Sequence, residues 1–191
     1  MTVFRFIHCS DLHIDSPFKG LASQVPALTE RLRESTFRAF YNIVKLAVEE
    51  KVDAVLIAGD IFDGTDRSLQ AQLKFRRGLL ELSEKGIPSF IVHGNHDPSN
   101  SWSHTLDWPE STTIFPGNRV ARFPVTQDGK KLAWIYGISY PQREVNENLA
   151  LKFKKDQDQS FAVGLIHANV GPPPGHDNYA PTHSQDSISS E

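Results

Sequence analysis

The sequence predicts an α/β fold built on a parallel β-sheet. Three apolar runs, at residues 3–8, 52–59 and 87–94, have the length and composition of buried strands. Two amphipathic stretches, 28–50 and 68–85, separate these runs and carry apolar residues three or four positions apart, as a helix requires. Strands that alternate with helices in this order usually form a parallel sheet with right-handed crossovers.

The second half of the chain follows a different pattern. Residues 119–140 predict two strands joined at Asp128-Gly129, a dipeptide that favours a hairpin turn. Residues 143–155 predict a helix, and residues 161–168 predict another buried strand.

Two segments show neither pattern. Pro98 to Thr112 is expected to form a polar loop. Residues 169–191 are rich in Pro, Gly and Ser and are expected to be a loop or a disordered tail, which places the folded domain at residues 1–168.

The composition limits the class of protein. The 191 residues carry a formal net charge of −3, which disfavours a simple DNA-binding module, although bound metal ions would alter the local field without entering this sum. The single cysteine, Cys9, excludes an internal disulfide and suits a reducing compartment. The sequence has no membrane-length apolar run and no signal-peptide core, so we expect a cytoplasmic protein without a membrane partner.

Polar side chains that can bind metal ions follow four of the predicted strands. Sites in parallel α/β sheets form beyond the carboxyl ends of the strands, so these residues are expected to meet. Carboxylates, imidazoles and an amide oxygen, without a thiolate cluster, suit a divalent ion such as Mn²⁺, Fe²⁺ or Zn²⁺. The residues, strand by strand, are Asp11 and His13, then Asp60 and Asp63, then Asn95, His96 and Asp97, and finally His167.

Three of these residues also have a simpler interpretation. Asp60 and Asn95 are good helix N-caps, and Asp63 precedes a predicted helix that it could cap. The recurrence of metal-binding side chains after four strands favours a shared site over unrelated caps. Gly59 and Gly94 directly precede two of the clusters, where a side chain would hinder a sharp backbone turn.

The blocks SDLH, GDIFD, GNHD and IHAN resemble, in this order, the first four signature blocks of the calcineurin-like metallophosphoesterases. Within that superfamily, FIHCSDLHIDSPFKGL and GHDNYAP resemble the bacterial DNA-repair exonucleases of the SbcD and YhaO type. The resemblance runs from about Val3 to about Pro181. It implies a β-sandwich flanked by helices, in four layers ordered α/β/β/α.

The resemblance also implies a role for each site residue. Two divalent ions, Mn²⁺ in preference to Fe²⁺ or Zn²⁺, would share a water and generate a hydroxide that attacks phosphorus. His96 would be the proton donor, with Asp97 and Asp63 as candidates to orient it. The implied metal ligands are Asp11 and His13 on the first ion, Asp60 between both ions, and Asn95 and His167 on the second.

One departure from the family pattern is important. The family closes its site with a later G-H-x-H block, and no such block precedes Glu191. Each ion would therefore lack one histidine, and the chain is expected to be truncated, with the C-terminal part of the fold missing. His176 or His183 could substitute, although their spacing matches no known block.

The predicted function is hydrolysis of DNA phosphodiesters in exonuclease-type DNA repair. Two alternatives stay open: another metallophosphoesterase, acting on phosphomonoesters or cyclic nucleotides, or a non-catalytic, truncated fragment. The resemblance further implies DNA as the substrate, a coiled-coil, SMC-like ATPase as a partner, and homodimerisation.

Overall fold

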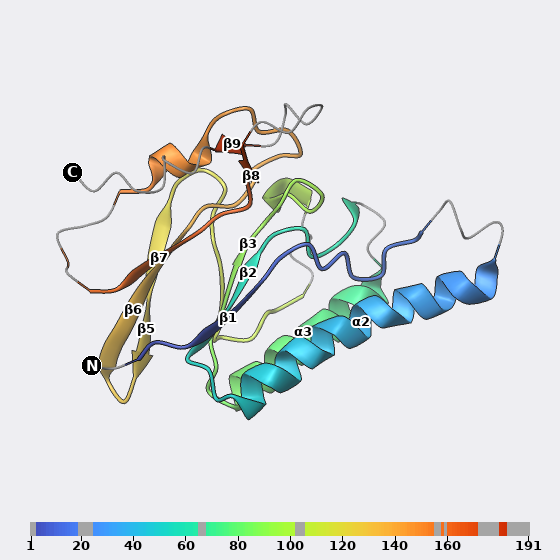
Figure 1. Cartoon of the computed structure of the whole chain (residues 1–191), viewed down its shortest axis with the longest axis horizontal. Helices are drawn as coiled ribbons and strands as arrows, with labels where there is room; N and C mark the ends of the chain where they lie inside the picture. The colour runs from blue at the N-terminus through green and yellow to red at the C-terminus, as the bar shows by residue number, and fades with distance from the viewer. Residues whose placement is uncertain are drawn as a thin grey trace.

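The two larger β-sheets of the chain pack face to face, and two long helices cover the outer face of the first of them (Figure 1). The computed structural model describes residues 3–18, 25–64, 68–101, 106–154, 158, 160–171 and 180–182. This arrangement confirms the α/β class and the packed pair of sheets that the sequence predicts.

The first sheet is entirely parallel and has the order β1-β2-β3-β4. The three predicted strands are confirmed as β1 (Phe6–Cys9), β2 (Ala54–Ala58) and β3 (Ser89–Val92). The fourth strand, β4 (Thr112–Ile114), was not predicted. It has three residues, too few to show a periodic pattern, and it begins where the predicted polar loop ends.

Helices α2 (Pro26–Glu49) and α3 (Leu69–Glu84) confirm the two predicted helices. Pro26 suits the first turn of α2 because its backbone nitrogen has no proton to leave unpaired. Ser68 caps α3 by accepting a hydrogen bond from the amide of Ala71 at 3.0 Å. No helix in the described ranges is both long enough and apolar enough to cross a membrane.

The second sheet contains β5 (Ala121–Gln127), β6 (Lys130–Gly137) and β7 (Ala162–Leu165). Strands β5 and β6 form the predicted hairpin, and β7 lies parallel to β6. The turn residues Asp128 and Gly129 have φ values of 50° and 74°, as a tight hairpin turn of mirror-image type requires.

Two apolar cores explain why β2 is a continuous apolar run. Val55 and Ile57 face the helices in the first core, whereas Leu56 and Ala58 face the second sheet in the other core. A strand that is covered on both faces has no polar side to alternate with. The sheets are therefore fixed relative to each other, with the carboxyl ends of β1, β2 and β3 at one end of the first sheet.

The predicted helix at residues 143–155 is wrong. The only helical turn in its described part, residues 143–154, is the 3-10 turn η3 (Leu149–Lys152), which Asn148 caps through a hydrogen bond from the amide of Ala150. The carbonyl of Val145 accepts a hydrogen bond from the amide of Ala180, so the backbone is used for a tertiary contact instead of a helix. The described residues thus show three layers, α/β/β, and no helical layer outside the second sheet.

Part of the expected C-terminal tail packs on the domain. Strands β8 (Asn169–Val170) and β9 (Pro181–Thr182) pair in parallel, and Ala180 is buried in a third apolar cluster. A short 3-10 turn, η2 (Ser99–Ser101), follows β3. The rest of residues 169–191, including His176 and His183, lies outside the described residues, so the boundary at residue 168 stays a prediction.

Candidate metal centre

The loops that follow β1 and β2 run side by side beyond the ends of the strands. The amide of Asp11 donates to the carbonyl of Gly59 at 3.1 Å, and the amide of His13 donates to that of Asp60 at 3.1 Å. A further bond joins the amide of Ile14 to the carbonyl of Ile61 at 2.8 Å. The parallel pairing of β1 and β2 therefore continues into the loops and brings the polar residues of both loops together.

Two glycines allow the loops to approach this closely. A Cβ on Gly94 would lie 2.1 Å from Oδ1 of Asp60, and one on Gly59 would lie 2.8 Å from both Gly94 N and His167 Nδ1. Gly59 also has a φ of 83°, which a residue with a side chain rarely adopts. The structure thus gives a physical reason for both glycines, in agreement with their expected role.

Asp11, His13 and Asp60 form the first half of the candidate centre. Each offers a ligand atom within 4.8 Å of the others, and Nε2 of His13 lies 3.9 Å from Oδ2 of Asp60. Asp60 is 3% exposed, and its Oδ1 is occupied by the amide of His96 at 2.9 Å. Its Oδ2 is therefore the atom that faces the neighbouring histidines.

Asn95 and His167 form the second half. Nε2 of His167 lies 3.0 Å from Oδ1 of Asn95 and 3.6 Å from Oδ2 of Asp60. Nδ1 of His167 lies 2.7 Å from the carbonyl of Ala58, to which it donates, so in the neutral ring Nε2 carries a lone pair. Three atoms with lone pairs then face one another, an arrangement that a divalent cation between them would stabilise.

Asp60 lies between the two halves, because its Oδ2 faces both His13 and His167. The donor set of carboxylates, imidazoles and an amide oxygen fits borderline divalent ions, and the residues present therefore fit a metal centre. The structure brings together all five residues that were predicted as metal ligands: Asp11, His13, Asp60, Asn95 and His167.

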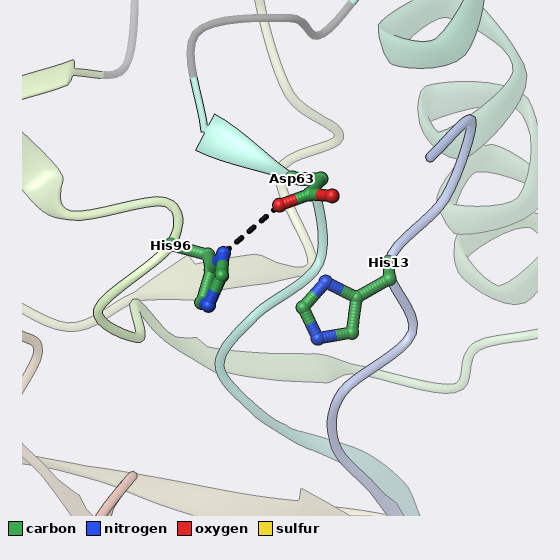
Figure 2. A group of neighbouring side chains, drawn as sticks. All are labelled: His13, Asp63 and His96. Carbon is green, nitrogen blue, oxygen red and sulfur yellow. Dashed lines mark hydrogen bonds and ion pairs between the residues drawn. The ribbon is translucent and has the colours of Figure 1, made fainter. Parts of the chain in front are cut away.

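His96 lies beside this centre and contacts Asp63 (Figure 2). Its Nδ1 is 2.9 Å from Oδ1 of Asp63, and the side chains of His96 and Asp63 are 34% and 35% exposed. The ring of His13 meets that of His96 edge to face, with centroids 5.1 Å apart. Among the described residues, the hydrogen bond of the His96 ring is made through Nδ1 and not through Nε2.

Opposing effects act on the pKa of the Asp63 carboxyl. Burial works to raise this pKa, but hydrogen bonds from Ser16 and His96, together with the charges of His96 and His13, lower it below its usual value. Asp63 is therefore ionised at neutral pH, and its carboxylate can only accept a hydrogen bond from Nδ1 of His96.

Asp97 acts on the backbone of the site. Its Oδ1 accepts hydrogen bonds from the amides of Asp60 and Gly94, at 3.1 and 2.9 Å, and its Oδ2 accepts from Ile61 and Phe62, at 2.9 and 3.4 Å. Asp97 thus joins the loops that follow β2 and β3. Its carboxylate is committed to these amides, whereas Asp63 is the acid that meets the His96 ring.

Burial raises the pKa of Asp97 to about 7, and the charge of Asp60 adds to this effect. Hydrogen bonds from the amides of Gly94, Ile61 and Phe62 oppose it. Asp97 is 0% exposed, so its carboxyl has no access to water as an alternative partner.

Asp15, which was not among the predicted site residues, anchors the loop after β1. Nε of Arg33 donates to its Oδ1 at 2.9 Å, and Oγ of Ser68 donates to its Oδ2 at 2.6 Å. Its amide donates to Oγ1 of Thr36 at 3.1 Å. Asp15 continues the alternation of Asp11 and His13, and this spacing was the available signal.

The stretch of chain that forms the candidate centre also matches a known protein family. The model of the calcineurin-like phosphoesterase family matches residues 4–189, which is nearly the whole chain. The chain belongs to this family, and the family expectation drawn from the four sequence blocks is confirmed.

Three relatives extend this result. The chain is 36% identical over its full length to the uncharacterised metallophosphoesterase YhaO of Bacillus subtilis, of which it covers 47%. It is 29% identical, over 81% of its length, to the DNA double-strand break repair protein Mre11 of Aeropyrum pernix, covering 38% of that protein. It is 28% identical, over 78% of its length, to SbcD of the Bacillus subtilis nuclease SbcCD, covering 37% of SbcD. The chain thus spans less than half of the length of these relatives.

Proposed function

We propose that this chain carries the metal-binding part of a phosphodiesterase that acts on DNA. One observation carries the proposal: Asp60 lies between two groups of ligand atoms, and His96 stands at the edge of the same centre. Family membership supports the phosphoester chemistry, and the geometry supports a centre with two ions.

Each residue has a role in the proposed reaction. Asp11 and His13 would hold one ion, Asn95 and His167 would hold the other, and Asp60 would bridge them. When bound, the ions supply Lewis acidity, which activates water and neutralises the phosphate; Mn²⁺ is our first choice, with Fe²⁺ and Zn²⁺ as alternatives.

His96 would protonate the leaving oxygen. Asp63 holds Nδ1 of the ring, so Nε2 would carry the proton that moves to that oxygen when its bond to phosphorus breaks. Asp97 would support the reaction indirectly, by holding the loops that carry Asp60 and Asn95.

The choice of DNA rests on the relatives. Mre11 is a DNA repair protein by name, SbcD belongs to a nuclease by name, and both align with most of this chain. These names support a role in DNA repair and, through the two-part nuclease SbcCD, a second polypeptide as a partner. An SMC-like ATPase as that partner, and homodimerisation, follow from the family resemblance. The single cysteine supports a cytoplasmic location.

Two alternatives remain in view. A phosphomonoesterase or cyclic-nucleotide phosphodiesterase would use the same centre on a smaller substrate. A non-catalytic fragment is the alternative if the centre needs ligands beyond the five candidates described here.

The test is hydrolysis by the 191-residue chain with Mn²⁺, measured on linear double-stranded DNA, phosphoserine and a cyclic nucleotide. We expect turnover of DNA alone. His96→Ala should lower that rate by about 10²-fold or more and leave Mn²⁺ affinity nearly unchanged, because it removes the proton donor but no ligand. His8→Ala, at an exposed histidine of β1, is the matched control and should retain the wild-type rate.

Turnover of phosphoserine or the cyclic nucleotide, without turnover of DNA, would show that DNA is not the substrate and would favour the first alternative. Loss of Mn²⁺ binding in the His96→Ala variant would show that His96 is a ligand and not the proton donor. No turnover of any substrate would support the non-catalytic fragment.

A further inference from the structure

We propose that Ser16 is a positioning residue, which fixes the Asp63 carboxylate and through it the ring of His96. Its effect on the reaction rate rests on the function proposed above, whereas its effect on the His96 ring does not. Ser16 lies three positions after His13 and belongs to none of the predicted site residues.

Three side chains form a continuous chain of hydrogen bonds. Oγ of Ser16 donates to Oδ2 of Asp63 at 2.9 Å, and Oδ1 of Asp63 lies 2.9 Å from Nδ1 of His96. Each carboxylate oxygen therefore has its own partner. With both oxygens engaged, the plane of the carboxylate is fixed, and so is the direction from which it meets the imidazole.

The hydrogen bond from Ser16 is important because the pair formed by Asp63 and His96 is open to solvent. The side chains of Asp63 and His96 are each about one-third exposed, at 35% and 34%. A carboxylate that is open to water and held at one oxygen can rotate about its terminal bond, since that torsion has a broad energy minimum. The Ser16 hydroxyl removes this freedom on the side away from His96.

Ser16 is itself held by the scaffold. Its amide donates to the carbonyl of His13 at 3.2 Å. The preceding residue, Asp15, is 6% exposed and is bound by Arg33 of α2 and by Ser68, the cap of α3. The hydroxyl is therefore carried by a loop segment that is fixed to both helices, and it transmits that rigidity to Asp63.

The chain of bonds also fixes the tautomer of the histidine. An ionised Asp63 accepts from Nδ1–H of His96, which directs Nε2 towards the centre. A loosely held carboxylate would favour the Nδ1–H form less.

The experiment compares Ser16→Ala with Ser16→Thr, which restores a hydroxyl at the same position. The first readout is the nitrogen-15 NMR spectrum of the histidine rings in the metal-free chain, with the His96 signals identified by His96→Ala. We expect the wild type and Ser16→Thr to show mainly the Nδ1–H form of neutral His96. Ser16→Ala should show a mixture of both tautomers.

The second readout is the rate of DNA hydrolysis with Mn²⁺. Ser16→Ala should lower kcat by about tenfold, the lower end of the range for partners that orient a site residue, with KM and Mn²⁺ affinity unchanged. Ser16→Thr should recover most of the rate. A role confined to folding would affect KM, metal binding and stability together and would leave the ring tautomer unaltered.

The two readouts separate the two proposals. If the His96 spectrum is the same in the wild type and in Ser16→Ala, the positioning role is wrong whatever the rate. If the spectrum changes as expected but the wild type hydrolyses no DNA, the proposed function fails and the positioning role stands. A fall in kcat that Ser16→Thr does not recover would also contradict the role of the hydroxyl.

Discussion

Three residues of the candidate centre adopt backbone conformations that are unfavourable for residues with side chains. Asp11, His13 and Asp60 have φ values of 53°, 41° and 53°, in the left-handed region. Such conformations cost on the order of 1–2 kcal/mol each and persist only where the surrounding structure enforces them. The paired amides of the two loops and the contacts of Asp15 and Asp97 provide this enforcement.

Asp97 is expected to be the most important of these contacts for stability. Asp97→Ala leaves four backbone N–H groups without their acceptor inside the protein. We expect a loss of about 2–4 kcal/mol in the free energy of unfolding, since each unsatisfied buried donor is costly and water enters only in part. Urea denaturation of the metal-free chain in EDTA measures this loss, and Asp97→Asn, which keeps one acceptor oxygen, should lose less.

Because the pKa of Asp97 is raised, the loss of stability in Asp97→Ala should depend on pH. The folded chain holds this proton up to about pH 7, whereas the unfolded chain releases it near the ordinary pKa of an aspartate, about 3.9. The stabilisation by Asp97 is therefore complete below about pH 4 and declines as the pH rises towards 7. The difference in the free energy of unfolding between the wild type and Asp97→Ala should therefore shrink from pH 5 to pH 8. A difference that grows over this range would contradict the raised pKa.

At the scale of elements, the contact between α2 and α3 depends on a glycine. Gly78 is buried on α3, and a Cβ there would lie 2.4 Å from Cε1 of Phe40 on α2. Phe40 is 1% exposed and packs against Phe75 at a centroid distance of 4.9 Å, so its ring has no room to move away. The two helices can approach this closely because the glycine has no side chain.

Gly78→Ala should therefore destabilise the chain, although alanine is the better helix former. Overpacking costs about 1–3 kcal/mol, against a helix-propensity gain of about 1 kcal/mol, so we expect a net loss of up to about 2 kcal/mol. Thermal or urea denaturation measures it. In a Phe40→Leu background the loss should shrink, because the ring that causes the clash is absent; an equal loss in both backgrounds would show that this contact is not the cause.

The elements that the sequence predicts well are those with a long helical period or a continuous apolar run. Helices α2 and α3 and the buried strand β2 differ from their predicted bounds by a few residues at most. The short strand β4 and the turn η3 were not predicted, because tertiary contacts decide their conformation: β4 pairs with β3, and Val145 pairs with Ala180.

The same distinction applies to the candidate centre. Asp60, Asn95 and His167 were predicted because the carboxyl end of a strand is visible in the sequence. The role of Asp97 in binding amides, and the contacts of Asp15 and Ser16, depend on the directions of side chains in the folded chain. The two-residue spacing after Asp11 and His13 could have drawn attention to Asp15, but no spacing states where these side chains point, so their contacts emerge only from the structure.

At the scale of the whole molecule, the packing of the two sheets explains how a residue that follows a strand of the second sheet reaches the first sheet. His167 follows β7 of the second sheet, yet its ring contacts Ala58 and Asn95, which belong to the ends of β2 and β3 in the first sheet. The apolar core between the sheets, with Leu56, Phe90 and Leu165, sets this approach. The candidate centre is therefore a product of the sandwich and not of one sheet alone.

The measurement that tests this account most directly is a calorimetric titration of the 191-residue chain with Mn²⁺, repeated on Asp60→Asn. We expect about two ions per chain, with dissociation constants on the order of 1 µM, because the described loops already bring five candidate ligands together. Asp60→Asn should weaken the binding of both ions, since Asp60 alone lies between the two halves among the described residues. Binding of one weak ion or none by the wild type, or an unchanged titration of Asp60→Asn, would contradict the account.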